Sequence, residues 1–294
     1  MDGAGTVSRE FAFTDREFEF LKEFFYTRTG IVLVERKREM VYGRLARRIR
    51  ALGLKSFKQY LDYVQTPEGD AEIGLMINAV TTNLTKFFRE PHHFEHLREV
   101  AIPAALDRCR QDGNRRIRLW SAGCSSGEEP YCMAITACDA IPNIRSWDIR
   151  ILATDLDSNM LQKGRKGTYQ GEMIEGFPPN MRKQWTSLAD RRMQSRQDGR
   201  TSARVQMNQK LIDMITFNQL NLMQSWPMKR KFDVIFCRNV MIYFDMETKN
   251  KLVQRYADTL HEGGILYVGH SESFPQGIPN FRPAGRTCYQ KNSQ

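Results

Sequence analysis

The fold of this 294-residue chain is decided by one stretch, Ile117-Arg118-Leu119-Trp120-Ser121-Ala122-Gly123-Cys124-Ser125-Ser126-Gly127-Glu128-Glu129-Pro130. Its apolar first part predicts a strand over residues 117–121, its glycine-containing middle predicts a loop, and a helix is expected to follow to about Asp139. A second strand is predicted over residues 149–153, closed by Thr154-Asp155-Leu156-Asp157. Strand, loop, helix and strand in this order are typical of a parallel α/β sheet.

The sequence towards the C-terminus continues this alternation after an interruption. We predict a buried strand over residues 232–237, a helix from about Glu247 to Leu260 that ends at Gly263-Gly264, and a strand over residues 265–268. Between Gly167 and Phe217 the alternation breaks, and we interpret this stretch as an insertion. It is basic through Arg191, Arg192, Arg196, Arg200 and Arg204.

Before residue 115 the sequence predicts helices and almost no strand. Thr14-Asp15-Arg16-Glu17 is a capping-box pattern, followed by apolar residues at helical spacing. Further helices are predicted over residues 37–52, from Ser56 to before Pro67, and over residues 70–80. Together these segments predict a small helical domain.

The second predicted helix carries a stripe of positive charge. Arg44, Arg47 and Arg48 are spaced i, i+3 and i+4, so they share one side of the helix. Residues 36–58 hold many Lys and Arg but a single acid, Glu39. A solvated face and a docking surface for an acidic partner both explain this stripe.

The composition is that of an ordinary globular protein, with 41% apolar and 27% charged residues. No uninterrupted apolar run is long enough to span a membrane, and Met1 to Phe13 lacks the apolar core of a signal peptide, so we expect a cytoplasmic protein that is not inserted in a membrane. Six scattered cysteines predict structural thiols. The net charge of +10 suits nucleic acid, an anionic membrane surface or an acidic protein as partner.

The loop after the first strand and the acid after the second predict a cofactor site. Ligands of open α/β sheets bind at the carboxyl ends of the strands, where glycines let the backbone come close. Asp155 stands where an acid accepts hydrogen bonds from ribose hydroxyls. The loop has neither G-x-G-x-x-G nor a P-loop lysine, so a cofactor with a ribose but no pyrophosphate is favoured, foremost S-adenosylmethionine. NAD and a purely architectural loop remain the alternatives.

Several segments closely resemble the chemotaxis receptor methyltransferases of the CheR family. They are Thr81-Thr82-Asn83-Leu84-Thr85-Lys86-Phe87-Phe88-Arg89-Glu90, Trp120 to Tyr131, Phe236-Cys237-Arg238-Asn239-Val240-Met241-Ile242-Tyr243-Phe244-Asp245, and Gly269-His270-Ser271-Glu272-Ser273-Phe274. They run in family order from about residue 15 to the end.

The resemblance implies an α/β protein in which an N-terminal all-helical domain precedes a Rossmann-like S-adenosylmethionine-dependent methyltransferase domain with a small inserted antiparallel β-subdomain. We expect a receptor-docking domain over residues 1–90, the methyltransferase domain over 91–294, and the β-subdomain over about 168–217. The implied reaction methylates glutamate side chains of chemotaxis receptors and leaves S-adenosylhomocysteine. The implied partners are the receptors' cytoplasmic methylation helices, met by Arg44, Arg47 and Arg48, and in some members a C-terminal receptor pentapeptide held by the β-subdomain. We expect a monomer that is recruited to receptor arrays.

The resemblance also implies a set of site residues. The cofactor would be held by Asn83, Thr85, Arg89, Glu129, Asp155, Asn221, Leu222, Arg238 and Asn239. Catalytic roles are expected for Arg89, which would pair with a carboxylate of cofactor or substrate, and for Tyr243, which would orient the glutamate by a hydrogen bond. A glutamate is already ionised near pH 7, so no general base is required.

Most of these residues have a simpler explanation. Asn83 and Thr85 could cap a helix, and Tyr243 could be a core residue. Glu128 competes with Glu129, and Asp157 with Asp155; the family register favours Glu129 and Asp155.

Two rival functions fit part of the sequence. A nucleic-acid methyltransferase would suit the charge, but Arg238-Asn239-Val240-Met241 lacks the prolines of base-modifying enzymes, so we expect no nucleic-acid partner. A non-catalytic adaptor that senses the cofactor is the second rival. His92, His93 and His96 lack a companion ligand set with metal spacing, so no metal is expected.

Overall fold

The structure is a computed structural model that describes residues 9–189, 203–272 and 280–293. The chain divides into two compact units, residues 1–82 and 83–294. This division falls earlier than the expected boundary at residue 90. Residues 83–90 bond to the rest of the second unit: the Phe88 backbone amide donates to Cys132 Sγ at 3.1 Å, and the Asn83 side-chain amide donates to Asp157 Oδ2 at 2.8 Å.

The first unit is all-helical, as predicted. Thr14 caps the first helix with both bonds of a capping box, and Ser56 caps the third by accepting from the Gln59 amide. The apolar stripes of the helices meet in one core that includes Phe18, Leu45 and Tyr60. The helices are α1 (Asp15–Thr29), α2 (Arg38–Ala51), α3 (Phe57–Tyr63) and α4 (Asp70–Val80), with short 3-10 turns η1 (Glu35–Lys37) and η2 (Pro67–Gly69).

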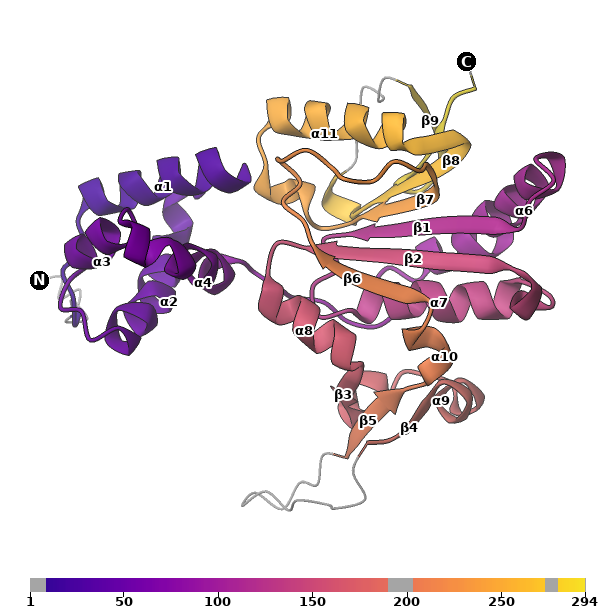
Figure 1. Ribbon diagram of the computed structural model, residues 1–294, viewed down its shortest axis with the longest axis horizontal. Helices are drawn as coiled ribbons and strands as arrows, with labels where there is room; N and C mark the ends of the chain where they lie inside the picture. The colour runs from indigo at the N-terminus through magenta and orange to yellow at the C-terminus, as the bar shows by residue number, and fades with distance from the viewer. Residues whose placement is uncertain (1–8, 190–202, 273–279, 294) are drawn as a thin grey trace, which may run out of the picture. The chain divides into compact units, whose positions relative to one another are not determined.

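The second unit is built on a seven-stranded sheet in the order β6-β2-β1-β7-β8-β10-β9 (Figure 1). The five strands from β6 to β8 are parallel, and β10 and β9 are antiparallel additions. Their bounds are β1 (Arg116–Ala122), β2 (Asp148–Asp155), β6 (Ile215–Gln219), β7 (Phe232–Cys237), β8 (Leu260–Val268), β9 (Phe281–Gly285) and β10 (Cys288–Lys291).

Helices cover this sheet, and their apolar faces complete the core. α7 packs against β1, β2 and β6, α8 against β2 and β6, α6 against β1, and α11 against β8. The helices are α5 (His92–His96), α6 (Ile102–Gln111), α7 (Glu128–Ala140), α8 (Ser158–Lys166) and α11 (Met246–Thr259), with turns η3 (Leu97–Ala101), η4 (Ile144–Ser146), η6 (Met241–Tyr243) and η7 (His270–Glu272). Within the described ranges, no helix is long and apolar enough to cross a bilayer.

The predicted insertion contains a second, three-stranded antiparallel sheet in the order β3-β5-β4. Figure 1 shows it apart from the large sheet, near one end of α8. Its elements are β3 (Thr168–Gln170), η5 (Gly171–Ile174), α9 (Pro179–Trp185), β4 (Thr186–Leu188), β5 (Arg204–Met207) and α10 (Gln209–Ile212). Arg191, Arg192, Arg196 and Arg200 of the basic run lie outside the described residues, as do Met1 to Ser8, Ser273 and Phe274.

Two predicted boundaries are wrong. Residues 215–217, expected in the insertion, belong to β6 and pair with β2 in the large sheet. The helix expected from about Glu247 to Leu260 is observed as α11, but the strand expected to begin at Ile265 begins at Leu260, so Gly263 and Gly264 lie inside β8 and do not separate helix from strand. The β7–β8 register shifts there, and Gly263 has a φ of 72°, so a local irregularity of the strand explains these glycines.

Candidate active site

The predicted cofactor loop lies at the point where the strand order reverses. From β1 the chain proceeds outward to β2 and β6, then returns to the other side of β1 with β7. Ligands of open α/β sheets bind at such a switch point, beyond the carboxyl ends of the strands. The loop between β1 and α7 folds back on the end of β2, because the Gly123 and Cys124 amides both donate to the Thr154 carbonyl, at 2.8 and 2.9 Å.

Two glycines of this loop are required by their surroundings. Gly123 has a φ of 90°, and a Cβ there would lie 2.3 Å from a methyl carbon of Val240. Gly127 has a φ of 99°, and its Cβ would lie 2.9 Å from Gly164 Cα. Positive φ values and such close approach both favour glycine, so any side chain at these positions would displace the loop.

The structure separates the roles of Asp155 and Asp157. Asp155 accepts the Ser125 amide on one oxygen at 2.7 Å and the Asp157 amide on the other at 2.9 Å. Asp157 instead caps α8, accepting from the Asn159 amide at 2.9 Å, and bonds the Asn83 side chain. Each Asp155 oxygen keeps acceptor capacity for a ligand, whereas Asp157 is occupied by the fold. Burial raises the pKa of Asp155 to about 6.

Asn83 and Thr85 do not cap a helix. Residues 83–86 have no regular structure, and the next helix begins only at His92. The Asn83 side chain bonds Asp157, and its carbonyl accepts from Ser125 Oγ at 3.2 Å. Asn83 therefore ties this segment to the loop after β1 and to the start of α8.

Glu128 and Glu129 are also separated. Glu128 is 1% exposed, and both of its oxygens accept from Ser126 Oγ, at 2.9 and 2.8 Å. Glu129 accepts from Ser121 Oγ at 2.7 Å and pairs with Arg238 at 3.1 Å. Burial raises the pKa of Glu129, while Arg238 and Ser121 oppose that rise. Glu128 bonds only its near neighbour Ser126 among these residues, whereas Glu129 bonds Arg238, which directly follows β7.

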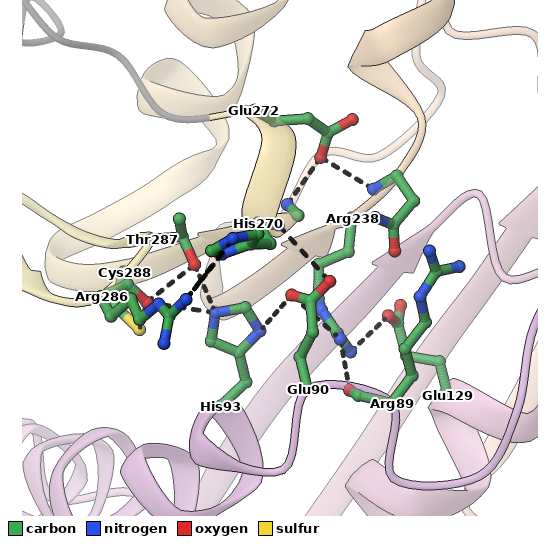
Figure 2. A network of polar contacts seen from close by, with 12 residues as sticks. Arg89, Glu90, His93, Glu129, Arg238, His270, Glu272, Arg286, Thr287 and Cys288 are labelled. Atoms are coloured by element: carbon green, nitrogen blue, oxygen red, sulfur yellow. Dashed lines mark hydrogen bonds and ion pairs between the residues drawn. The ribbon is translucent and has the colours of Figure 1, made fainter.

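Arg238 is the centre of a buried polar network (Figure 2). Its side chain is 2% exposed, and one Nη lies 3.1 Å from Glu129 Oε2. The other Nη lies 3.4 Å from Glu90 Oε2 and also donates to the Arg89 carbonyl. Within the described part of the chain, Arg238 Nε and Glu90 Oε2 have no hydrogen-bond partner. Glu90 Oε2 still contacts Arg238 and His93 Nδ1, each at 3.4 Å. Buried polar atoms are nearly always satisfied, so Arg238 Nε is the atom of this network that indicates a place for a ligand or water.

The two residues predicted to be catalytic lie on irregular segments. Arg89 is half-buried and donates to the Leu84 carbonyl at 2.9 Å. Tyr243 ends the turn η6 and is half-buried, so it is not a core residue. Asn239 adopts a left-handed conformation, with a φ of 59°, directly after Arg238.

Asn221 and Leu222 follow β6, the strand next to β2. Asn221 Oδ1 accepts from the Met223 amide at 2.9 Å, and Leu222 is buried. Because β6, β2, β1 and β7 are parallel, the predicted cofactor residues that follow them share one edge of the sheet.

Sequence reasoning missed two acidic residues of this network. Glu90 ends the segment Thr81 to Glu90, whose resemblance to the family implies no role for this residue. Glu272 is buried and accepts backbone amides of Gly269, Asn239 and Ile242, at 2.6, 2.7 and 3.0 Å. Its presence in the quoted segment Gly269 to Phe274 was the available signal.

Glu90, His92 and His93 place ligand-type atoms within 4.8 Å of one another. A cation there would share the Glu90 carboxylate with Arg238, whose Nη is 3.4 Å away, and like charges repel strongly in a buried site. Burial and the nearby Arg238 lower the pKa of His93 to about 3, and its Nε2 lies 2.8 Å from Thr287 Oγ1. We interpret His93 as a neutral core residue. The expectation of no metal stays a prediction.

The predicted docking stripe of the first unit is only partly available. Arg44 donates to the Val80 carbonyl at 2.7 Å, at the end of α4. Arg48 forms a two-point pair with Glu72, at 2.8 and 2.6 Å. Only Arg47 of the three is exposed. Two of these arginines therefore stabilise the helical unit itself.

The reversal of strand order at β1, the glycine loop beyond it and the acid that ends β2 define a Rossmann-like cofactor site, and together with the family models this is the class of S-adenosylmethionine-dependent methyltransferases. The sequence comparisons agree. The family model described as "CheR methyltransferase, SAM binding domain" matches residues 83–289, and the model "CheR methyltransferase, all-alpha domain" matches residues 16–81. The chain belongs to the CheR methyltransferase family.

Named relatives span nearly the whole chain. A probable chemotaxis protein methyltransferase of Rhizobium etli is 47% identical over 84% of this chain and 88% of its own length. Chemotaxis protein methyltransferase 2 of Pseudomonas aeruginosa is 37% identical over 96% of this chain and 95% of its own length. The Escherichia coli chemotaxis protein methyltransferase is 36% identical over 96% and 93%. This protein is thus an S-adenosylmethionine-dependent methyltransferase of chemotaxis.

Proposed function

We propose that this protein methylates glutamate side chains of chemotaxis receptors, giving glutamyl methyl esters and S-adenosylhomocysteine. The observation that carries the proposal is the set of atoms left available at the sheet edge. Asp155 keeps acceptor capacity on both oxygens, Arg238 Nε has no hydrogen-bond partner among the described residues, and at Gly123, where a Cβ would clash with Val240, the loop presents backbone without a side chain. These features suit a ligand with a ribose and a charged end.

The cofactor would be held at this edge by the residues predicted from the family. Asp155 would accept the ribose hydroxyls, because its ionised oxygens are acceptors only. The Glu129–Arg238 pair would face the charged amino-acid end, where each member offers one sign of charge. The remaining contacts would come from Asn83, Thr85, Arg89, Asn221, Leu222 and Asn239.

The reaction needs positioning more than proton transfer. When bound, S-adenosylmethionine supplies a methyl group on a positively charged sulfur, and a glutamate carboxylate accepts it without losing a proton. Tyr243 would orient the carboxylate by a hydrogen bond, and Arg89 would pair with a carboxylate of the substrate or the cofactor. Holding reactants in line and excluding water are then the main sources of rate.

The substrate would be the methylation helices of the receptors, which Arg47 and its exposed basic neighbours would meet. The partly described β-subdomain would hold a receptor C-terminal pentapeptide, and the protein would act as a cytoplasmic monomer recruited to receptor arrays. Calorimetry with aromatic-acidic pentapeptides tests the second point: heat of binding supports it, and no heat with any of them contradicts it.

The direct test incubates the purified protein with tritiated S-adenosylmethionine and either receptor-rich membranes or nucleic acid. We expect label in receptor protein that mild alkali releases, because methyl esters hydrolyse readily. The matched variant Tyr243→Phe should lower the rate while it keeps affinity for S-adenosylhomocysteine. Alkali-resistant label in nucleic acid would overturn the proposal, and cofactor binding without any transfer would point to an adaptor.

A further inference from the structure

The turn between β7 and α11 carries two residues that the proposed function uses, Asn239 and Tyr243. Little regular structure supports it: Asn239 is left-handed, and only the short turn η6 follows. A non-glycine residue in that conformation is uncommon and persists only where its surroundings hold it. The feature that holds this turn is therefore part of the site.

Glu272, on the segment after β8, is bonded to both ends of this turn. Its Oε2 accepts the Asn239 amide at 2.7 Å and the Gly269 amide at 2.6 Å, and its Oε1 accepts the Ile242 amide at 3.0 Å. Figure 2 shows the first two bonds converging on one oxygen. One carboxylate thus joins the ends of β7 and β8, which are adjacent strands.

The chemistry of the position favours a carboxylate over any other side chain. Glu272 is 6% exposed, and its hydrogen-bond partners, which also include the Met241 amide, are all backbone N–H donors. An ionised carboxylate accepts hydrogen bonds on both oxygens. A glutamine in its place would have an NH2 group in the position of one oxygen, so that N–H donors would face N–H donors. Burial raises the pKa of Glu272, and the amide donors oppose that rise. Bonds to a charged acceptor are also the stronger kind.

Gly269 shows how tightly the carboxylate is enclosed. A Cβ at this position would lie 2.6 Å from Asn239 Nδ2, 2.7 Å from Glu272 Oε2 and 2.8 Å from the Asn239 amide nitrogen. Real Cβ contacts are essentially never this short, so a side chain would push Asn239 away from the carboxylate. The absence of a side chain at Gly269 therefore lets the Glu272 carboxylate approach Asn239.

We propose that Glu272 is a positioning residue of the methyltransferase, which holds the Asn239–Tyr243 turn in the conformation that presents Asn239 to the cofactor and Tyr243 to the substrate. This inference rests on the proposed function for the roles of Asn239 and Tyr243. The hydrogen bonds of Glu272 to the turn do not depend on those roles. Experiments can therefore contradict the positioning role of Glu272 and the proposed function independently.

The first measurement is hydrogen exchange of the full chain without ligand. Glu272→Gln and Gly269→Ala should speed exchange in the peptides that contain residues 237–244 and 264–272, while the rest of the second unit stays protected as in the wild type. Glu262→Gln is the matched control, because Glu262 is exposed and the chemical change is the same. Unchanged exchange in both variants would overturn the proposal.

The second measurement is function. Glu272→Gln should weaken S-adenosylhomocysteine binding and lower kcat by about tenfold each, while KM for the receptor substrate stays near the wild-type value, since leaving a buried donor unpaired is worth about one order of magnitude in an equilibrium. Combined with Tyr243→Phe, the loss in kcat should be smaller than the product of the two single losses. Wild-type affinity and kcat in a variant with faster exchange would overturn the positioning role. A wild-type protein that neither binds S-adenosylhomocysteine nor transfers methyl groups would instead overturn the proposed function.

Discussion

Each of the two units contains an arginine–glutamate pair with one buried member, Glu72 in the first and Arg238 in the second, and the two pairs differ in how completely their hydrogen bonds are satisfied. In the first unit, Glu72 accepts Arg48 at two points and the Tyr60 hydroxyl at 2.9 Å. In the second, Arg238 reaches Glu129 and Glu90, but its own Nε and one Glu90 oxygen lack hydrogen-bond partners in the described ranges. The network around Glu72 is fully hydrogen-bonded within its own unit and stabilises the fold. The network around Arg238 retains a donor without a partner, so it can still bind a ligand or water.

The same contrast corrects the interpretation of charge in the sequence. The basic stripe of α2 predicted a docking surface, yet Arg44 and Arg48 satisfy groups of their own unit. Arg238 is not part of a basic cluster in the sequence, but it pairs with Glu129 and Glu90 at the centre of the candidate site. A cluster of positive charge in a sequence therefore predicts that acceptors or anions lie nearby. It does not show whether these belong to the same protein or to a binding partner.

The largest effect is expected at Arg238. Arg238→Ala leaves Glu129 and Glu90 near one another without their shared cation, which should lower the free energy of unfolding by about 3 to 5 kcal/mol. Binding of S-adenosylhomocysteine should be lost as well. Urea unfolding and calorimetry of the same preparation measure both quantities. Retained affinity in a folded variant would show that this network is structural, like the one around Glu72.

The corresponding change in the first unit is Arg48→Ala. Glu72 is 4% exposed and would lose its cation, so we expect a loss of about 2 to 3 kcal/mol in unfolding free energy, partly offset by the remaining Tyr60 bond. Affinity for S-adenosylhomocysteine should not change. The double variant Arg48→Leu/Glu72→Leu should recover part of the stability, because no buried charge remains unpaired, while the buried Tyr60 hydroxyl loses its acceptor. A weakened affinity in either variant would break the comparison.

The pH dependence of binding sharpens the assignment of Asp155. Burial raises the pKa of this carboxyl to about 6, so its ionised form is lost as the pH falls below that value. Binding through its two oxygens should weaken by about tenfold per pH unit below about pH 6. The effect on folding stability has the opposite sign, because the folded protein holds the Asp155 proton more tightly than the unfolded chain does. This stabilisation is fully present below the pKa of the unfolded state and is lost as the pH rises through about 6. Calorimetry with S-adenosylhomocysteine from about one pH unit below to about two units above the raised pKa checks the first point.

Asp155→Asn is the variant for this titration. It should bind more weakly at neutral pH and lose most of the pH dependence between those limits. An unchanged pH profile would assign the titration to another group and leave Asp155 without a binding role.

The smallest effect on stability is expected at Arg47. Because its side chain is exposed, Arg47→Ala should change the free energy of unfolding by less than about 0.5 kcal/mol. The rate of receptor methylation should fall and become less sensitive to salt, since one docking charge is removed. Arg36→Ala, another exposed arginine of the first unit, is the control for a general loss of positive charge. Equal effects of both variants would favour diffuse attraction over docking at α2.

Local signals in the sequence were sufficient for the elements that depend on near neighbours. The capping box at Thr14, the bounds of α4 and the strand over residues 232–237 are observed as predicted. Caps and apolar periodicity act over a few residues, so the sequence carries them directly. The boundary at Gly263-Gly264 was missed because strand pairing across β7 and β8 overrides the local preference of glycine for a helix end.

The sequence by itself determined the class of the sheet, the helical first unit and the motifs that define the family. It also narrowed the acids of the site to two neighbouring pairs, Asp155 with Asp157 and Glu128 with Glu129. Only the tertiary structure decided which member of each pair is occupied by its own turn, that Arg48 is paired inside the first unit, and that Glu272 holds the turn after β7. The physical reason is distance along the chain: Arg238 and Glu129 are 109 residues apart, and Arg48 and Glu72 are 24 apart. Strand register and helix packing bring such distant residues together, and neither can be predicted from the sequence immediately around each residue.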